Sequence, residues 1–356
     1  MNKFFNKKII ILFVVVGTVI ITIPFFQKSY SQKIDPRDVS MITYGLSGSR
    51  FGDGLVSYMH AKWLSYKYDI PVLYTPFPQS EYLLLAKKEM SPEQRPHSSF
   101  KEIVHLTSKK NIERFINHKK EKGILYIIPY YSEYEGECNN AFFKQFFTVE
   151  WRDKKFYNLL REHVASDNIH PQPVRHSNLV NVALHLRTGR GFDKLAKPGD
   201  DFKKAIKGEK NFCNVYFPLK LPALNFYSNA LHQLCILLKH RPIHVHIFTD
   251  DPHPEEVIKA LKNQIAHKYS GKLEFTFDHT SQNDLDILKD FFTMTHFDCL
   301  IRPASNFSFC AAKISDFLIE ISPKSLVITD QFFFINKFHV QHNDGQAFDI
   351  TIPVED

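Results

Sequence analysis

The chain has 356 residues, of which 44% are hydrophobic, and its formal net charge is +7. This composition excludes an intrinsically disordered protein, and the length is enough for two domains of ordinary size. The basic balance suits anionic partners such as phosphates or a membrane surface. Because the sequence contains no run of five basic residues and no DNA-binding motif, it does not predict nucleic-acid binding. The five cysteines form no CxxC pair, so neither a zinc site nor a dense disulfide framework is predicted.

The N-terminal residues predict a membrane anchor. Residues 9–26 are uncharged and mostly aliphatic, and three lysines precede them. A helix over this range is roughly 27 Å long, close to the thickness of the hydrocarbon core. We expect a cytoplasmic tail over 1–8, a stem over 27–37, and the rest of the chain in the lumen or exterior, as in the Golgi or endoplasmic reticulum of a eukaryote. The alternative is a signal peptide that is cleaved near Ser29–Ser31, which would give a secreted protein.

Residues 38–170 predict an N-terminal α/β domain. A strand, a glycine-rich turn, a helix and a second strand follow one another, and this series is typical of a parallel sheet. The expected strands are Val39–Tyr44, Pro71–Tyr74 and Gly123–Ile128, and the expected helices are one containing Leu55, Met59 and Trp63 and one over residues 150–165. Residues 75–120 are basic and less regular, and the proline-containing segment 166–177 is the best linker candidate.

Residues 178–356 predict a Rossmann-like C-terminal domain, because strands and helices alternate with the pattern of a doubly wound sheet. The expected strands are 179–186, 243–248, 273–277, 297–301 and 325–328, and the expected helices are 224–238, 254–267, 286–295 and 307–318. Such sheets bind ligands beyond the carboxyl ends of their strands. The polar residues that follow each strand are therefore the candidates for a site.

The first such cluster begins at the end of the strand 179–186 and includes His185, Arg187 and Gly189. The planar guanidinium of an arginine that leaves a buried strand can bind two phosphate oxygens at once. It can also stabilise the charge that develops on a departing nucleotide. The alternative is an ordinary surface or ion-pair arginine.

The second cluster is Thr249–Asp251, after the strand 243–248. Its two carboxylates could hold a metal or bind a ribose or base, but a helix cap is the better expectation because a helix begins near Pro254. His244 and His246 share one face of the strand, and without a third ligand at metal spacing we expect them to pack in the core.

The third cluster contains Asp290 and the segment Ser305, Asn306, Phe307 and Ser308, which opens a helix. Backbone N–H groups and a hydroxyl at a helix N-terminus form a phosphate site. The alternative is a simple N-cap. Residues 306–308 also match the N-glycosylation sequence, but their expected place inside a domain argues against its use.

A glycine-rich turn in the first domain, residues 45–54, precedes a helix and could approach a ligand through its backbone. It lacks both the dinucleotide spacing GxGxxG and the phosphate-loop sequence GK[ST]. Its candidate contact residues are Gly48, Arg50, Gly52 and Asp53.

Taken in order, these elements resemble the fucosyltransferase superfamily of the α1,2-, α1,6- and nodulation fucosyltransferases. That family has a glycine loop after its first strand, then H-x-R, then [ST]-D-D, then D-F-x-x-M-S and N-S-[ST]-F-S. The similar segments here are residues 45–54, 185–190, 248–252, 290–295 and 304–308, so the resemblance covers most of residues 40–320. Thr188 and Arg190 depart from the second Arg and the Asp of the family, and Ala304 replaces the usual Asn.

The resemblance implies two facing Rossmann-like domains of the GT-B type, with no metal required. It implies that Arg187 contacts the donor β-phosphate, that His185 and Asp290 contact guanine, and that Ser305 touches phosphate. The expected donor-binding residues are His185, Gly189, Asp250, Asp290, Ser305, Asn306, Phe307 and Ser308.

The sequence thus predicts a membrane-anchored glycosyltransferase that transfers fucose with inversion from GDP-fucose to a glycan hydroxyl. A carboxylate near the cleft is expected to act as general base, and Asp53 and Asp193 are the guesses. The Lys-rich stretch Lys194–Leu221 is either an acceptor-side loop or a solvated insertion. The alternatives are another nucleotide-sugar donor on the same fold, a non-catalytic glycan- or nucleotide-binding relative, and a secreted structural protein.

Overall fold

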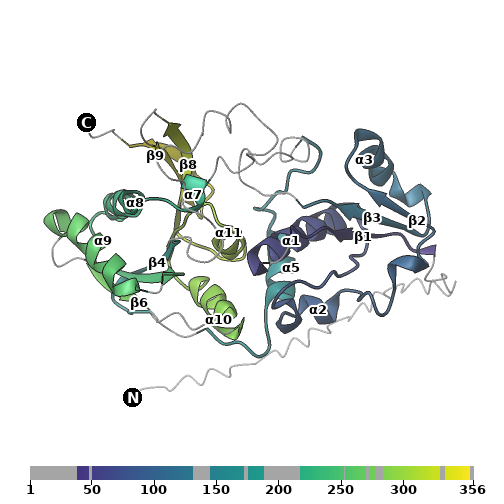
Figure 1. The fold of residues 1–356 in the computed structure, drawn as a ribbon, viewed down its shortest axis with the longest axis horizontal. Helices are drawn as coiled ribbons and strands as arrows, with labels where there is room; N and C mark the ends of the chain where they lie inside the picture. The colour runs from purple at the N-terminus through teal and green to yellow at the C-terminus, as the bar shows by residue number, and fades with distance from the viewer. Residues whose placement is uncertain are drawn as a thin grey trace, which may run out of the picture. The chain divides into compact units, whose positions relative to one another are not determined.

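The computed structural model describes residues 38–47, 50–130, 145–171, 175–187, 217–251, 253–269, 273–277, 284–328 and 333–352. Residues 36–356 form one compact unit that contains a three-stranded and a seven-stranded sheet (Figure 1). The predicted tail, anchor and stem lie outside the described residues. Within the described ranges, no helix combines the length and the apolar character that a bilayer-spanning segment needs.

The smaller sheet has the order β1-β3-β2, and all its strands are parallel. Its strands are β1 (Met41–Tyr44), β2 (Glu102–His105) and β3 (Ile124–Ile128). Its helices are α1 (Phe51–Tyr68), α2 (Leu85–Lys88), α3 (Lys109–Ile116) and α5 (Lys154–Val164), with 3₁₀ turns at Ser80–Tyr82, His97–Ser99 and His118–Lys120. The predicted parallel sheet is confirmed around β1 and β3.

Two features of this sheet differ from the expectation. The predicted strand Pro71–Tyr74 forms only isolated bridges, between Ile42 and Val72 and between Leu73 and Met90. Conversely, β2 and α3 lie in the stretch that appeared irregular. In β2 only Val104 is buried, so this edge strand lacks the hydrophobic run that reveals an interior strand.

The larger sheet has the order β10-β9-β8-β7-β4-β5-β6. Its strands are β4 (Val180–Leu186), β5 (Ile243–Thr249), β6 (Leu273–Phe277), β7 (Cys299–Ile301), β8 (Ile319–Ile328), β9 (Phe333–His342) and β10 (Ala347–Thr351). The strands β4 to β8 are parallel, as predicted for a doubly wound sheet. The chain runs outward from β4 through β5 to β6 and then returns to β7 on the other side of β4. The topological switch point of the sheet therefore lies between β4 and β7.

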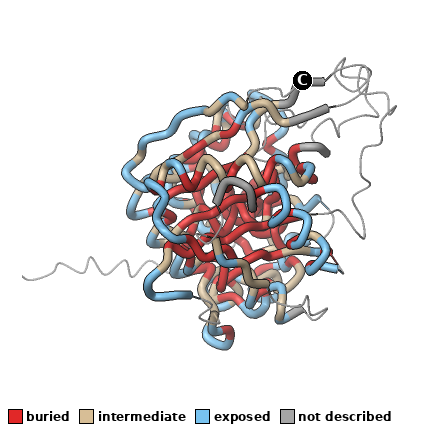
Figure 2. Tube along the Cα trace, turned by 90° about the vertical axis from the view of Figure 1, so that its left-hand side faces the viewer, coloured by how far each residue is buried: buried red, intermediate tan, exposed pale blue. Residues whose placement is uncertain are grey.

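Helices cover both faces of this sheet (Figure 1). They are α7 (Phe217–Lys220), α8 (Leu224–Leu237), α9 (Pro254–Tyr269), α10 (Asp284–Met294) and α11 (Asn306–Lys313). The helices α8 and α9 share one hydrophobic core with β4 and β5. The helices α10 and α11 belong to a second core, which continues into α1 and the smaller sheet. In Figure 2 the buried residues form the continuous interior of this unit.

The edge of the larger sheet contains two strands, β9 and β10, that the sequence did not predict. The strand β9 runs antiparallel to both β8 and β10. The strand β8 also begins at Ile319 rather than at Ser325. Because β10 is mostly exposed and carries Asp349, which pairs with Lys324 and His339, its sequence lacks the apolar pattern of a core strand. The division into domains 38–170 and 178–356 stays a prediction.

Candidate functional site

A hydrogen bond crosses the switch point of the larger sheet. His185, near the end of β4, bonds through Nδ1 to Oγ of Ser308 in the first turn of α11, at 2.7 Å. Both residues are buried, and α11 follows β7, the neighbour of β4. The crevice of a doubly wound sheet lies at its switch point. Here the end of β4 and the helix that follows β7 are joined by His185 and Ser308, two residues that the sequence predicted for the site.

The surroundings of His185 keep its imidazole neutral. Burial, with the positive charges of Arg187 and Arg302, lowers the pKa of His185 to about 3. The Phe307 ring lies against the imidazole, with the ring centres 5.5 Å apart. The histidine is therefore uncharged, and the positive charge that acts on it belongs to Arg187 and Arg302.

Arg187 connects the ends of β4 and β5. Its backbone N–H donates to the Tyr227 hydroxyl on α8 at 3.3 Å, and its Nε lies 4.0 Å from Oδ2 of Asp250. The Arg187 side chain is 13% exposed and that of Asp250 is 37% exposed. Tyr227 thus fixes the backbone of Arg187 and Asp250 lies beside its guanidinium, which is partly exposed and can bind the oxygens of a diphosphate in a defined orientation.

The second guanidinium, that of Arg302, is held by a carboxylate on the neighbouring strand β8. Arg302 follows β7, is buried, and donates through Nε to Oε1 of Glu320 on β8 at 2.7 Å. Lys313 lies 3.9 Å from the other oxygen of this carboxylate. Burial alone would raise the pKa of Glu320, but Lys313 and Arg302 together lower it to about 2. Glu320 is therefore ionised and fixes the Arg302 side chain.

The N-terminus of α11 meets the N-terminus of α1. The Asn306 side chain donates through Nδ2 to Oδ1 of Asp53 at 2.7 Å and to the Tyr130 hydroxyl at 3.1 Å. Ser305 occupies the N-cap position, but its side chain makes no capping hydrogen bond. The alternative of a side-chain cap at Ser305 is thus not what the structure shows. Asn306 is buried and its amide is engaged, which agrees with our view that the glycosylation sequence is not used.

Close backbone packing holds these two helix ends together. A Cβ added to Gly52 would lie 2.6 Å from the backbone nitrogen of Phe307, so only glycine fits at this position. The Phe51 ring packs against Phe291 and Phe307, with ring centres 5.1 and 6.2 Å away. The glycine-rich turn that the sequence singled out therefore lies beside the predicted phosphate segment.

The structure brings most of the predicted site residues into one neighbourhood through direct contacts: His185, Arg187, Asp250, Asn306, Phe307, Ser308, Gly52 and Asp53. Asp290 is half-buried on α10, and its neighbour Phe291 packs against Phe307 with the ring centres 5.5 Å apart. Arg50 is exposed just before α1. Gly48, Gly189, Asp193 and residues 194–216 lie outside the described residues.

Three residues of this neighbourhood were not singled out from the sequence: Tyr130, Tyr227 and Arg302. Arg302 carried a usable signal, because it directly follows a buried strand of the parallel sheet. Tyr130 and Tyr227 carried none, since each reaches the site through a contact between segments that are distant in the chain.

In the second predicted cluster, Thr249–Asp251, the two aspartates make different contacts. Asp251 Oδ1 accepts from the backbone N–H of His253 at 2.8 Å, which shapes the turn before α9 but is not the expected helix cap, because His253 precedes the helix. Asp250 instead faces Arg187. His244 and His246 are buried and both bond to the Thr276 hydroxyl, which confirms their packing role. Within the described residues, no group of three His, Cys, Asp or Glu side chains could hold a metal ion.

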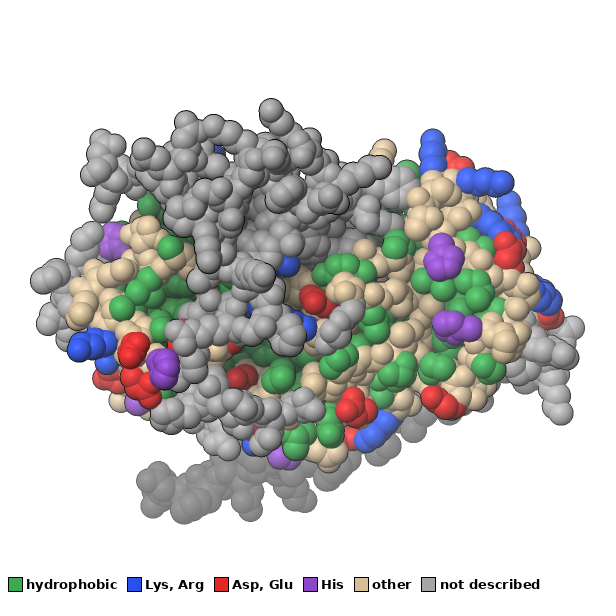
Figure 3. Space-filling model, viewed as in Figure 1, with side chains coloured by type: hydrophobic (Ala, Val, Ile, Leu, Met, Phe, Trp, Pro, Cys, Tyr) green, Lys and Arg blue, Asp and Glu red, His purple; other side chains and the backbone are tan. Residues whose placement is uncertain are grey.

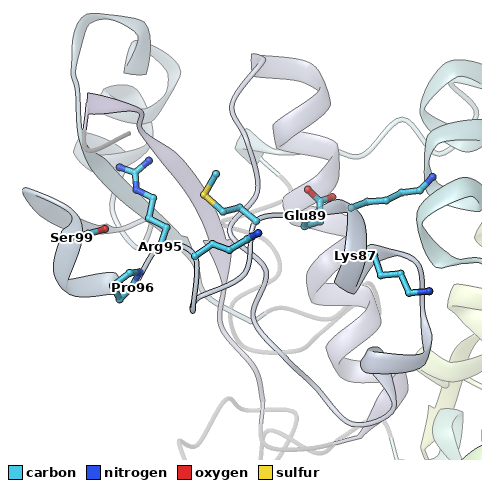
Figure 4. Close-up of a pocket in the computed structure, with 8 residues that line it drawn as sticks. Lys87, Glu89, Arg95, Pro96 and Ser99 are labelled. Atoms are coloured by element: carbon cyan, nitrogen blue, oxygen red, sulfur yellow. The ribbon is translucent and has the colours of Figure 1, made fainter. Parts of the chain in front are cut away.

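A pocket of about 590 Å³ lies elsewhere, between α2 and the turn at His97–Ser99 (Figure 4). Its lining includes Glu89, Arg95 and Ser99 and none of the predicted site residues. Lys87 points away from Arg95 and pairs with Asp167 at 2.9 Å, so its charge is neutralised on the far side (Figure 4). We therefore do not assign the donor to this pocket.

The charged surface at β2 and α3 contains ion pairs between its own side chains. Figure 3 shows acidic and basic side chains gathered at this end of the molecule. Arg114 donates to both oxygens of Glu102 at 2.6 Å and pairs with Glu121. Arg114 is thus paired with two carboxylates, so we do not assign an anion site to it.

The fold and the site together define a mixed α/β protein with parallel sheets and a positively charged cluster at a topological switch point. No protein-family model matches the chain, and no curated protein matches it. The solved structures that are similar to the chain include fucosyltransferases. POFUT1 in complex with GDP-fucose has a TM-score of 0.40 and 11% identity, covering 80% of this chain and 96% of that one.

Two further similar structures are enzymes of the same kind. An Arabidopsis thaliana FUT1 variant in complex with GDP has a TM-score of 0.44 and 10% identity, covering 81% of this chain and 71% of that one. The NodZ α-1,6-fucosyltransferase soaked with GDP-fucose has a TM-score of 0.35 and 11% identity, covering 88% of this chain and all of that one.

Proposed function

We propose that the chain is a glycosyltransferase that transfers fucose with inversion from GDP-fucose to a hydroxyl of a glycan. The observation that carries this proposal is the His185–Ser308 bond across the switch point, together with the positive charges of Arg187 and Arg302, which act on His185. A doubly wound sheet binds its ligand at this place, and the charge there suits an anion. The order of the motifs along the chain supports GDP-fucose as that anion.

In the proposed reaction, the β-phosphate of the donor lies at Arg187 and at the N-terminus of α11. The departing GDP gains negative charge as the bond to the sugar breaks, and a guanidinium and helix N–H groups stabilise that charge. Asp250 keeps the Arg187 side chain oriented. Asp290 and the neutral His185 are assigned to guanine. Since the protein itself supplies positive charge at the phosphates, the proposal includes no metal ion.

Ligand-dependent melting tests the donor. The chain is titrated with GDP, UDP and ADP, each without metal and with EDTA. GDP at saturation is expected to raise the melting temperature by a few degrees, because a ligand that binds only the folded state stabilises it. The Arg187→Ala variant should lose most of this shift. Arg161→Ala is the matched control, since Arg161 is exposed and lies 3.9 Å from Asp316.

Release of GDP separates the enzyme from a non-catalytic relative. The parent is incubated with GDP-fucose, GDP-mannose and UDP-galactose, and the free nucleotide is measured over time. Release from GDP-fucose alone supports the proposal, whereas release from another donor reassigns the sugar. Binding of GDP without any release would show that the chain is a binding protein and would overturn the proposed reaction.

A further inference from the structure

We propose that Asp53 is the general base of this reaction and that Asn306 is the residue that positions it. This inference rests on the proposed function and assigns the group that removes the proton from the acceptor. Asp53 lies in the first turn of α1, while Asn306 opens α11, so the assigned base comes from the helix that follows β1 of the smaller sheet. The 2.7 Å bond between their side chains joins residues that are 253 positions apart.

The location of Asp53 suits a base rather than a phosphate ligand. Asn306 precedes Phe307 and Ser308, and Ser308 bonds to His185, so Asp53 lies at the edge of the proposed donor site. A carboxylate repels phosphate, but it can accept a proton from a hydroxyl group that approaches the sugar. Asp53 is half-exposed, which leaves it within reach of a second substrate.

The two carboxylate oxygens of Asp53 differ in their contacts. Oδ1 accepts from Asn306, while Oδ2 has no hydrogen-bond partner among the residues that the structure describes. Oδ2 is therefore the oxygen that accepts the proton. The acceptor oxygen forms a bond to the anomeric carbon as the bond from that carbon to the β-phosphate oxygen breaks. The hydroxyl proton passes to Oδ2, and the electron pair of the broken bond leaves with GDP.

The Asn306 amide is oriented for this task at a cost in hydrogen bonding. Its Nδ2 serves Asp53 and Tyr130, whereas its Oδ1 is buried and has no partner within the described part of the chain. A flipped amide would place Oδ1 against the carboxylate, where two acceptors repel each other. The observed orientation instead places Nδ2, a donor, against the Asp53 carboxylate. Among the described residues, the Asn306 amide is the group that bonds the Asp53 side chain, and the Tyr130 phenol accepts from the same amide.

Hydrolysis of GDP-fucose in the absence of an acceptor tests the assignment, because water then takes the place of the hydroxyl. Asp53→Asn preserves an oxygen that can accept from Asn306 but cannot accept a proton. We expect GDP release to fall about 100-fold or more, with an unchanged melting shift by GDP. Asp316→Asn is the matched control, because its side chain is 74% exposed, and it should keep the parent rate.

Rescue by an external carboxylate distinguishes a base from a structural aspartate. Formate is expected to restore hydrolysis in Asp53→Ala by about tenfold or more and to leave Asp53→Asn unchanged, since only the shorter side chain leaves room for it. Asn306→Asp places a second carboxylate beside that of Asp53. In a plot of hydrolysis rate against pH, the acidic limb should therefore move to higher pH. A purely structural Asn306 would change the melting temperature without moving that limb.

The outcomes separate this inference from the function on which it rests. A parent that cleaves GDP-fucose while Asp53→Asn keeps its rate overturns the assignment of the base and leaves the transferase intact. A parent that neither binds GDP nor cleaves GDP-fucose overturns both. Loss of GDP binding in Asp53→Asn would assign Asp53 to the donor site and so also contradict its role as base.

Discussion

Gly52 and Phe307 are in backbone contact: a Cβ on Gly52 would lie 2.6 Å from the nitrogen and 2.9 Å from the Cα of Phe307. One residue belongs to the first turn of α1 and the other to the first turn of α11. The Cys310 thiol, also on α11, lies 3.7 Å from the Gly52 carbonyl oxygen. The absence of a side chain at Gly52 is thus what allows two helix ends to meet, and with them Asp53 and Asn306.

We expect Gly52→Ala to destabilise the protein by about 1–3 kcal/mol, because backbone atoms cannot move aside as a flexible side chain can. Urea denaturation measures the change in the free energy of unfolding. Gly45→Ala is the matched control, since a Cβ at Gly45 would meet its nearest atoms at an ordinary 3.4 Å. Equal stability of the two variants would show that α1 and α11 are not in close contact.

The neutral state of His185 predicts a dependence of stability on pH. The pKa of His185 is lowered to about 3 in the folded state, against an ordinary value near 6.5. Between these values the unfolded chain binds a proton that the folded chain does not, so stability is complete above about pH 6.5 and falls as the pH decreases. We therefore expect the His185→Gln variant to lose less stability than the parent between pH 6 and pH 5.

The size of this difference is bounded by a single proton. One group contributes at most about 1.4 kcal/mol per pH unit to the slope of the unfolding free energy against pH. His118, His163 and His244 also have lowered pKa values and contribute a slope of the same sign to both proteins. Denaturation at several pH values should give a shallower slope for the variant, and identical slopes would mean that His185 is charged in the fold.

The sequence predicted the interior of the larger sheet well, for a physical reason. The strands β4 and β5 are buried along nearly their whole length, so each appears as a hydrophobic run between polar segments. The antiparallel edge was missed because β10 lies mostly at the surface and carries little of that pattern. Pro71–Tyr74 has strand-like residues but forms only isolated bridges, which no local property of the sequence reveals.

The sequence predicted some residues of the candidate site but not the contacts between distant segments. A polar residue after a buried strand can be recognised in the sequence, and this rule identified His185, Arg187 and Asp250. The bond between Asp53 and Asn306 was not predictable, because it depends on how α1 and α11 approach each other in three dimensions. The guess at Asp53 came from the need for a carboxylate, and the structure supplies the contact that gives it a role.

The N-terminal anchor stays a prediction that fractionation can test. We expect the full chain to sediment with membranes and to resist extraction by carbonate at high pH, because a helix over residues 9–26 would bury its side chains in lipid. A chain that begins at residue 36 should remain in the supernatant. Secretion of a shortened full-length product would instead support cleavage of a signal peptide.

The buried pair of Arg302 and Glu320 gives the last prediction. Nε and a terminal nitrogen of Arg302 lie 2.7 and 2.6 Å from Oε1 of Glu320, and both side chains are at most 10% exposed. Glu320→Ala would leave the guanidinium buried without its carboxylate, so we expect a loss of about 3–5 kcal/mol in the free energy of unfolding. Replacing both residues, by Arg302→Met with Glu320→Leu, should recover part of that loss, because the guanidinium is no longer buried without its carboxylate, whereas Lys313 still loses its contact with Glu320. The double variant should also show a smaller melting shift with GDP, since one of the two guanidinium groups beside His185 is gone. A double variant as unstable as Glu320→Ala would mean that packing, and not the unpaired charge, sets the cost.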